Sequence, residues 1–225
     1  LQAMEIKGIN PALLTRRSLA VTVVRVDSPG LIWVHIKNAQ QDFQEMMEDL
    51  QVMMQRRGRY LACLPNQVQE DQIVAIRDGN RWHHGCFAAI EGDLARVTLK
   101  DWGRNVLRPL HECHRLPVRL HEVSWQAVPC SLSRVGPMQP ADIWRFDTRQ
   151  MAKALAEHRS GWIKIRKAVE DAAIVDLTID NHPEDGAYDL KDILIRMGYI
   201  QQAPKNYQVG SVYPGITRRP RGCAA

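Results

Sequence analysis

The sequence lacks the features by which several large classes of protein are recognised. Its five cysteines include no CxxC pair, and an odd number of thiols at irregular spacing is not typical of a disulfide framework. No run approaches the roughly 18–20 apolar residues of a membrane span, and the first residues contain no signal-peptide core. We therefore expect an intracellular protein with free, mostly buried thiols and no membrane contact.

The motifs of several enzyme classes are also missing. The chain has no nucleophile elbow, no phosphate-binding glycine loop and no HExxH motif. Asp27, Asp176 and Asp180 lie in or beside predicted strands, but no pair of arginines accompanies them to bind a scissile phosphate. We expect no catalysis, no cofactor and no metal in this region. A residual nuclease stays open as an alternative, and a metal-dependent cleavage assay would detect it.

What is present is the composition of a globular protein. Of the 225 residues, 45% are hydrophobic and 24% are charged, which is enough to bury a sizeable core. At roughly 100–200 residues per domain, this length fits one large domain or two small ones. Because the chain begins at Leu1 rather than at a methionine, we expect it to be a domain of a longer protein.

Most of the net positive charge lies at the C-terminal end. Lys and Arg number 30 and Asp and Glu 25, which gives +5, and the segment 205–225 has four basic residues and no acidic one. The remainder of the chain therefore carries only +1. A basic tail of this kind usually keeps a domain solvated, although it can also contact nucleic acid or an acidic partner. We expect residues 203–225 to form a flexible basic tail.

The periodicity of the first half predicts a hairpin, a helix and a small barrel. Residues 19–26 and 31–36 are rich in β-branched side chains and flank a turn. Residues 40–54 carry apolar side chains three and four positions apart, which predicts an amphipathic helix that packs on the hairpin. We expect Gly58 to end this helix in a left-handed cap. Short strands separated by polar turns then predict a barrel from 73–76, 81–90, 94–100 and a strand starting at Val106.

The second half predicts further strands and two helices. Asp142 is the expected N-cap of a helix that reaches about His158, with Phe146 among its inward residues. Asp189 is the expected cap of a last helix, which Gly198 ends. Strands are expected within 121–135 and at 162–165 and 173–179. Four tryptophans in strand patterns are expected in the core: Trp33, Trp82, Trp125 and Trp162.

Four segments, in order, resemble motifs of the extended Tudor domain. Residues 26–34 are similar to its entry strands, 78–85 to its "DG-x-WYRA" strand with one residue more, and 97–103 to its "DYGN" turn. Residues 188–199 are similar to its closing helix, in the form found next to spindle-E-type DExH helicases. In this family a Tudor barrel interrupts a staphylococcal-nuclease-like, OB-type fold.

The resemblance covers about residues 18–202 and implies a mainly β fold with helices, in which one barrel is inserted into another. The parts it implies are a nuclease-like first part with a linking helix (18–66), a Tudor barrel (67–118) and a nuclease-like second part (119–202), ahead of the tail.

The resemblance also implies a function. Extended Tudor domains of germline small-RNA (piRNA) pathway proteins typically bind arginine-rich tails of Piwi or other Argonaute-class partners, often methylated on arginine. A dimethylated guanidinium is flat and weakly hydrated, so several aromatic faces can enclose it. The implied function is a non-catalytic protein-interaction module of gene silencing, with a peptide partner, in cytoplasmic and perinuclear germ granules.

The aromatic cage of the family is incomplete in this sequence. Only Trp102 is a clear aromatic among the matching positions, and Arg104 replaces the amide that accepts a guanidinium proton, with Asn105 one step later. We therefore expect weak or no dependence on methylation, with the peptide near Trp102 in a cleft between the two halves. Because Gly103 suits a tight turn, we expect Trp102 and Arg104 on the binding face rather than in the core. The degenerate cage positions are Ile76, His83, Leu99, Trp102 and Arg104.

Two further functions stay open. An OB-type half and a basic tail together can bind single-stranded RNA, with an affinity that falls steeply as salt increases. The segments 83–86 and 111–114 each hold histidine and cysteine and could in principle supply a tetrahedral zinc site. Against zinc, His83 and His84 point to opposite faces of one strand.

Overall fold

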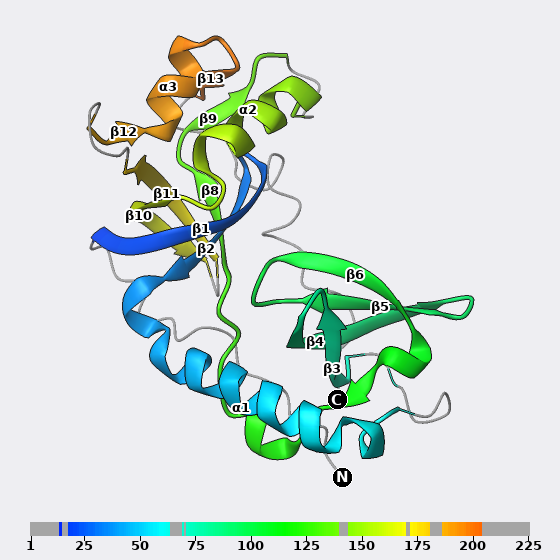
Figure 1. Ribbon diagram of the computed structural model, residues 1–225. Helices are drawn as coiled ribbons and strands as arrows, with labels where there is room; N and C mark the ends of the chain where they lie inside the picture. Colours follow the sequence, from blue (N-terminus) through cyan, green and yellow to red (C-terminus); the bar gives the residue numbers. More distant parts are fainter. Residues whose placement is uncertain are drawn as a thin grey trace. The chain divides into compact units, whose positions relative to one another are not determined.

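The computed structural model describes residues 14, 18–63, 69, 71–139, 144–169, 172–180 and 186–203. Within these ranges the chain divides into two compact units (Figure 1). The first unit is Asn38–Ala127, and the second joins the residues up to Lys37 with those from Val128 onward. One unit is thus inserted into the sequence of the other, as the sequence resemblance implies. The tail expected at 203–225 lies outside the described residues, apart from Ala203.

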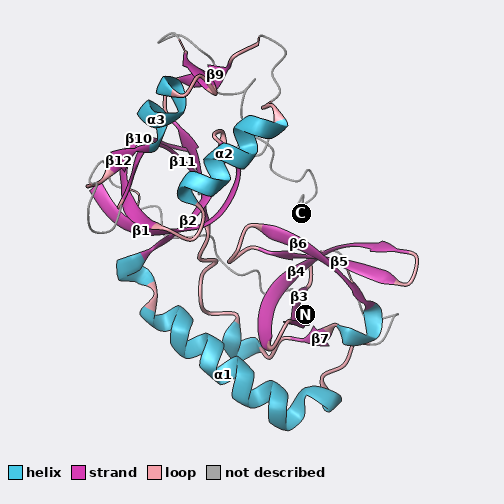
Figure 2. Ribbon diagram, turned by 45° about the horizontal axis from the view of Figure 1, so that its top comes forward, coloured by secondary structure: helices cyan, strands magenta, loops and turns pink. Residues whose placement is uncertain are grey.

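The inserted unit is built around a five-stranded antiparallel barrel (Figure 2). Alternation along the strands points Val74, Ile76, Val97 and Leu99 into its interior, where all four are fully buried. Gly85 is required here, because a Cβ at this position would lie 2.6 Å from Cγ1 of Val97. The strands follow the spatial order β6-β5-β4-β3-β7 and are β3 (Ile73–Asp78), β4 (Arg81–Glu91), β5 (Leu94–Leu99), β6 (Arg104–Pro109) and β7 (His114–Arg115).

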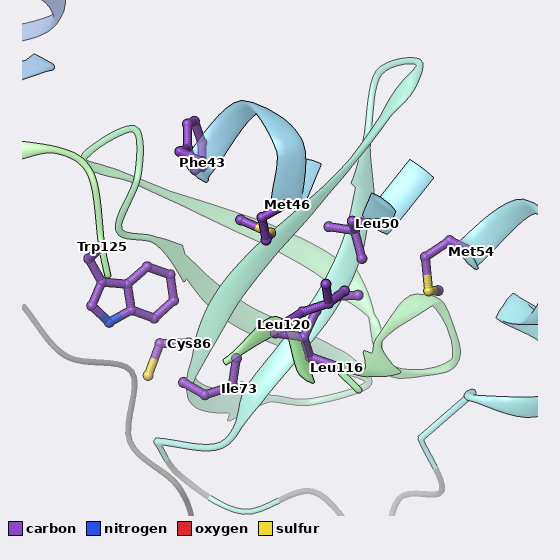
Figure 3. Close-up of a cluster of buried hydrophobic side chains, with 10 residues drawn as sticks. Phe43, Met46, Leu50, Met54, Ile73, Cys86, Leu116, Leu120 and Trp125 are labelled. Atoms are coloured by element: carbon purple, nitrogen blue, oxygen red, sulfur yellow. The ribbon is translucent and has the colours of Figure 1, made fainter. Parts of the chain in front are cut away.

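Helix α1 (Gln41–Arg57) covers the outer face of this barrel. Its apolar stripe packs against Ile73, Ala75 and Cys86 of β3 and β4 (Figure 3). The expectation that the helix packs on the hairpin is therefore wrong, because the apolar outer faces of β3 and β4 bury the stripe instead. The stripe consists of Phe43, Met46, Leu50 and Met54, and Leu116, Leu120 and Trp125 complete the cluster.

The side chain of Gln51 fixes the position of α1 on the barrel. Its Nε2 donates to the carbonyl of Trp82 and its Oε1 accepts from the amide of Trp82, each over 2.8 Å. At its end the helix differs from expectation, because Gly58 has φ −51° and continues into a 3-10 turn, η3 (Gly58–Tyr60). No left-handed cap is formed there.

The second unit contains the OB-type barrel. Strands β1 (Ser18–Ser28) and β2 (Leu31–Ile36) form the expected hairpin, and β8 (Val128–Leu132) pairs with β2. Strand β10 (Ser160–Val169) pairs with both β1 and β11 (Ala172–Ile179), and this closes five strands into a barrel. β8 and β11 run parallel, and β12 (Tyr188–Asp189) extends the sheet beyond β11.

Two helices and a short ribbon complete this unit. Helix α3 (Leu190–Arg196) begins as predicted, since the Asp189 carboxylate accepts a hydrogen bond from the amide of Asp192 at 3.0 Å. Gly198 follows α3 with φ +77°, a conformation that favours glycine. β9 (Val135–Pro137) and β13 (Ile200–Gln202) form the ribbon.

Helix α2 (Phe146–Ala156) differs from the prediction at its start. The expected cap, Asp142, lies outside the described residues, and Arg145 precedes the helix without a capping side chain. Phe146, expected inward, is exposed, because the buried face of α2 is lined by the small residues Thr148, Ala152 and Ala156.

The expected burial of the four tryptophans is only partly confirmed. Trp125 is buried as expected, whereas Trp33 and Trp82 are half-buried and Trp162 is exposed. The sequence of β10 alternates apolar and polar residues, and Trp162 falls on the polar, outward side. No helix in the described ranges is long and apolar enough to cross a membrane.

The division of the chain also differs from the expected domain limits. The compact units change at 37/38 and 127/128, so α1 and residues 119–127 belong with the Tudor barrel. The reason is the cluster beneath α1, which Leu120 and Trp125 join.

Candidate peptide-binding face

Two hairpins of the inserted barrel bring the five degenerate cage positions together. Ile76 and His83 are cross-strand partners of β3 and β4, and Leu99 is the partner of Arg104 in β5 and β6. Trp102 lies in the turn between β5 and β6, where its amide donates to the carbonyl of Leu99 at 3.0 Å. This turn closes through a residue with φ +64°, Gly103, as expected from the sequence.

Two of the five positions belong to the barrel interior. Ile76 and Leu99 are both 0% exposed and pack in the cluster that fills the barrel. A side chain without exposed surface cannot contact a ligand while the strands keep this arrangement. The expectation that Ile76 and Leu99 line a peptide site is therefore corrected, because the inward alternation of β3 and β5 makes them core residues.

The two rings of this face, His83 and Trp102, contact each other. The Trp102 Nε1 donates to Nδ1 of His83 at 3.2 Å, and the two rings are nearly perpendicular, at 88° with centroids 5.9 Å apart. Burial lowers the pKa of His83, and the nearby Arg104 lowers it further, against an opposing effect of Asp78. His83 is thus uncharged at neutral pH, so its Nδ1 can accept a hydrogen bond from the indole N–H of Trp102.

The side chain of Trp102 is partly packed into the fold and partly exposed on its surface. It is half-buried and packs against both hydrophobic clusters of the unit, and its ring lies 6.4 Å from that of Phe43. The expectation that it stands outside the core is therefore met only in part.

Arg104, which takes the amide position of the cage, is held by an ion pair. Its guanidinium contacts Oδ2 of Asp78, and Arg108 contacts Oδ1 of the same carboxylate at 2.6 Å. One carboxylate thus serves two guanidinium groups, which leaves this edge of the barrel positive. The neighbouring amide, Asn105, accepts from Thr98 Oγ1 at 2.7 Å and is not placed to replace it.

Sequence reasoning missed a buried polar pair directly behind this face. Nδ1 of His84 lies 3.1 Å from Oδ2 of Asp101, and both side chains are almost completely buried. The backbone N–H of Gln126 donates to Oδ1 of Asp101 at 3.0 Å, and the His84 ring stacks on Trp125 with centroids 4.5 Å apart. The signal was available, because His84 follows His83 and must point to the opposite face of β4, toward α1.

Burial decides the protonation of this pair. Desolvation raises the pKa of Asp101 to about 8 and lowers that of His84 to about 3. At neutral pH burial therefore favours the uncharged form of both groups. The pair ties the turn that carries Trp102 to the segment that follows the barrel.

The proposed zinc ligands do not come together. Cys86 packs in the cluster beneath α1, Cys113 packs inside the barrel, and His84 stacks on Trp125. Among the residues that can be described, no three His, Cys, Asp or Glu side chains are grouped to hold a metal.

The two carboxylates of the predicted strands are bound by protein groups. Asp27 accepts from Arg25 at 2.7 Å and from the indole of Trp33 at 3.1 Å. Asp176 accepts from Ser133, Arg166 and Lys191, and the hydrogen bonds and these cations hold its pKa below the usual range despite its burial. Asp180 lies just beyond the end of β11.

Comparison with known proteins identifies the family. Residues 14–134, more than half of the chain, match the Tudor domain family, and the chain belongs to it. Its fold is that of the extended Tudor domains. No curated protein is a significant match.

Solved structures carry the same fold at low identity. The third extended Tudor domain of mouse TDRD1, solved with a MILI peptide containing dimethylarginine 45, has a TM-score of 0.74 at 14% identity, over 89% of this chain and 100% of that chain. The extended Tudor domain of BmPAPI, solved with symmetric dimethylarginine, has a TM-score of 0.71 at 19% identity, over 83% and 99%. The Drosophila melanogaster Papi domain, a D287A variant solved with an unmethylated Piwi N-terminal peptide, has 0.71 at 15%, again over 83% and 99%.

Proposed function

We propose that this domain is a non-catalytic module that binds a peptide segment of a protein partner, with little or no dependence on arginine methylation. The partner is a Piwi or other Argonaute-class tail, or another protein of the piRNA pathway. Family membership supports an interaction module, and solved domains of the same fold bind peptides of MILI and Piwi. We also propose a place in cytoplasmic, perinuclear germ granules, and the closing helix favours a spindle-E-type helicase as the parent protein.

The observation that carries this proposal is the ion pair between Arg104 and Asp78 at the amide position of the cage. A dimethylated guanidinium needs an acceptor for its remaining N–H and aromatic faces on several sides. Here the acceptor is replaced by a cation, and the two rings present are His83 and Trp102, which meet edge to face. Methyl groups on the arginine of the ligand would therefore add little to its binding affinity.

The proposed contact surface is formed by Trp102, His83 and Arg104. A half-buried indole can anchor an apolar or planar side chain, and Arg104 can bind carbonyl or carboxylate oxygens of the peptide. Because Trp102 is packed against two clusters, the surface is preorganised and a peptide orders few side chains on binding.

The alternative function is RNA binding by the OB-type half and the basic tail. A titration at two salt concentrations separates the two functions. We expect an arginine-glycine peptide to lose little affinity between low and physiological salt. For single-stranded RNA, whose phosphates would be neutralised by basic side chains of the protein, the affinity should fall by orders of magnitude over the same range.

The experiment uses the whole chain, with Arg104→Glu as the test variant and Arg96→Glu as its control. Arg96 lies on the neighbouring strand β5 and pairs with Glu91, and neither residue belongs to the proposed surface. Altered peptide affinity in Arg104→Glu alone supports the proposal. RNA that binds more tightly than the peptide and depends steeply on salt would overturn it.

A further inference from the structure

The outer side of the β3–β4 hairpin carries a cavity that the proposed peptide face does not use. It has a volume of about 620 Å³ and lies within the unit Asn38–Ala127. Arg77 and Trp82, which line it, are cross-strand partners and share one side of the hairpin. Ile76 and His83, the next pair, point to the other side. The cavity and the Trp102 face thus lie on opposite sides of one hairpin.

Three arginines from three different elements line this cavity. Arg59 comes from η3, Arg77 from β3 and Arg108 from β6. Arg56 and Arg57, by contrast, lie in the last turn of α1, where cations are expected because of the helix dipole. That explanation does not extend to the three arginines of the cavity, since none of them belongs to an α-helix.

Acidic groups do not neutralise the three arginines. Among the described residues that line the cavity, Glu112 is the one acid, against three arginines. Arg108 shares the carboxylate of Asp78 with Arg104. In the part of the chain that the structure describes, Arg59 and Arg77 form no ion pair with an acid. Arg59 instead donates to the hydroxyl of Tyr60 at 2.7 Å.

An apolar surface lies next to these charges. The half-buried Trp82 lines the cavity together with Met54 of α1, and Gln51 holds the Trp82 backbone in place. The Trp82 ring makes an edge-to-face contact with His114, with centroids 5.0 Å apart, so its orientation is fixed. A rigid indole beside several guanidinium groups matches a ligand that has both an apolar side chain and oxyanions.

We propose that this cavity binds an acidic segment of a protein partner. An apolar or aromatic side chain of the segment packs on Trp82, and carboxylates on either side of it bind Arg59, Arg77 and Arg108. The volume of 620 Å³ falls in the usual range of ligand sites, roughly 300–1,000 Å³, and accommodates a few side chains. Arginine is suited to the carboxylates because its planar fork binds them in a bidentate manner.

The same features disfavour single-stranded nucleic acid as the occupant. Sites for such strands combine a basic groove with a series of aromatic platforms. Here the arginines surround one cavity, Trp82 is the single tryptophan that lines it, and one contact of its ring is occupied by His114.

The test measures fluorescence anisotropy of labelled short probes with the whole chain. The probes are a peptide with Glu and Asp on both sides of a central Phe, its Gln and Asn counterpart, its phosphoserine counterpart, and a single-stranded RNA. The variant Arg59→Glu with Arg77→Glu removes the two arginines that lack an acidic partner. Lys164→Glu, exposed on β10 of the other unit, is the control of equal charge change per site.

We expect the acidic peptide to bind the wild-type chain at least about tenfold more tightly than its amide counterpart, which corresponds to about 1.4 kcal/mol. The double variant abolishes this preference and Lys164→Glu retains it. We expect the phosphoserine peptide, which also carries oxyanions, to show the same loss of affinity in the double variant. The indole N–H resonance of Trp82, assigned with Trp82→Phe, shifts with the acidic peptide.

Three outcomes overturn the proposal. The first is no preference for the acidic over the amide peptide. The second is equal loss in Lys164→Glu, which would indicate attraction by net charge alone. The third is RNA that binds more tightly than the peptide and is lost in the double variant.

Discussion

Nδ1 of His84 lies 3.1 Å from Oδ2 of Asp101, and the pair is sealed between the barrel and the indole of Trp125. Asp101 belongs to the turn that carries Trp102, so the protonation of this pair is coupled to the stability of the candidate site. Because the folded pKa values are about 8 for Asp101 and about 3 for His84, the two groups respond to pH in opposite directions.

The sign of each effect follows from the unfolded values of 3.8 and 6.5. The raised pKa of Asp101 gives stability that is complete below pH 3.8 and is lost as the pH rises toward 8. The lowered pKa of His84 gives stability that is complete above pH 6.5 and is lost as the pH falls toward 3. The two effects oppose each other between pH 3.8 and 6.5, so the contribution of the pair changes little there and declines at lower and at higher pH.

Comparison of the wild-type chain with Asp101→Asn isolates the carboxyl group. We expect the difference in unfolding free energy, measured by urea denaturation, to shrink steadily from pH 4 to pH 8, since the wild type alone loses the Asp101 contribution. A difference that stays constant or grows over this range would show that the buried carboxyl is ionised at neutral pH.

The side-chain amide of Gln51 should contribute more to stability than any other polar contact between α1 and the barrel. Gln51→Ala removes both hydrogen bonds to the backbone of Trp82, and we expect a loss of about 1–2 kcal/mol of stability. Gln41→Ala is the matched control on the same helix, because Gln41 is exposed and its side chain donates to Glu45 of the same helix at 3.2 Å. We expect a change of less than about 0.5 kcal/mol there. Equal effects in chemical denaturation would contradict this role.

Trp102 should contribute to stability as well as to binding. Since it is half-buried and packs against two clusters, Trp102→Ala should cost about 2–3 kcal/mol, below the 3–5 kcal/mol typical of larger truncations in a full core. Trp102→Phe keeps most of the packing but removes the donor to His83, so a loss of about 1 kcal/mol is expected. If thermal and urea denaturation of Trp102→Ala match the wild type, the indole is a surface platform only.

The two units should differ in their ability to fold alone. Residues 38–127 contain both clusters of the barrel and its covering helix, so this fragment should melt cooperatively. Residues 128–203 lack β1 and β2, which lie between β10 and β8 in the sheet, and should not fold without residues 18–36. Circular dichroism melts of both fragments test this, and a cooperative transition in 128–203 alone would refute it.

The sequence predicts this fold well where local chemistry decides. β-branched runs locate β1, β2, β10 and β11, and the Asp189 cap and Gly198 locate α3 because each acts within one turn of chain. The sequence does not predict the structure where a packing partner that is distant in the sequence determines it. The stripe of α1 shows that the helix must bury one face, but only the apolar outer sides of β3 and β4 determine where.

The candidate site is predicted in the same partial way. The alternation of β4 separates His83 from His84, yet it does not reveal that His84 meets Asp101 or that Trp125 covers the pair. Motif matching placed Ile76 and Leu99 in a cage, whereas aliphatic side chains at inward positions become core. The outer cavity escaped prediction because its three arginines come from segments far apart in the sequence.

Calorimetric titration tests most directly whether this Tudor face binds peptide without requiring methylation. Matched arginine-glycine peptides, unmethylated and symmetrically dimethylated, are titrated into the wild-type chain and into Arg104→Asn, with Arg96→Asn as the control. Because Arg104 binds peptide oxygens in the proposed contact, Arg104→Asn should lower the affinity for both peptides by roughly fivefold, or about 1 kcal/mol, and Arg96→Asn should leave it unchanged. For the wild type we expect both peptides to bind within a few-fold of each other. A preference of tenfold or more for the methylated peptide, about 1.4 kcal/mol, would contradict the account.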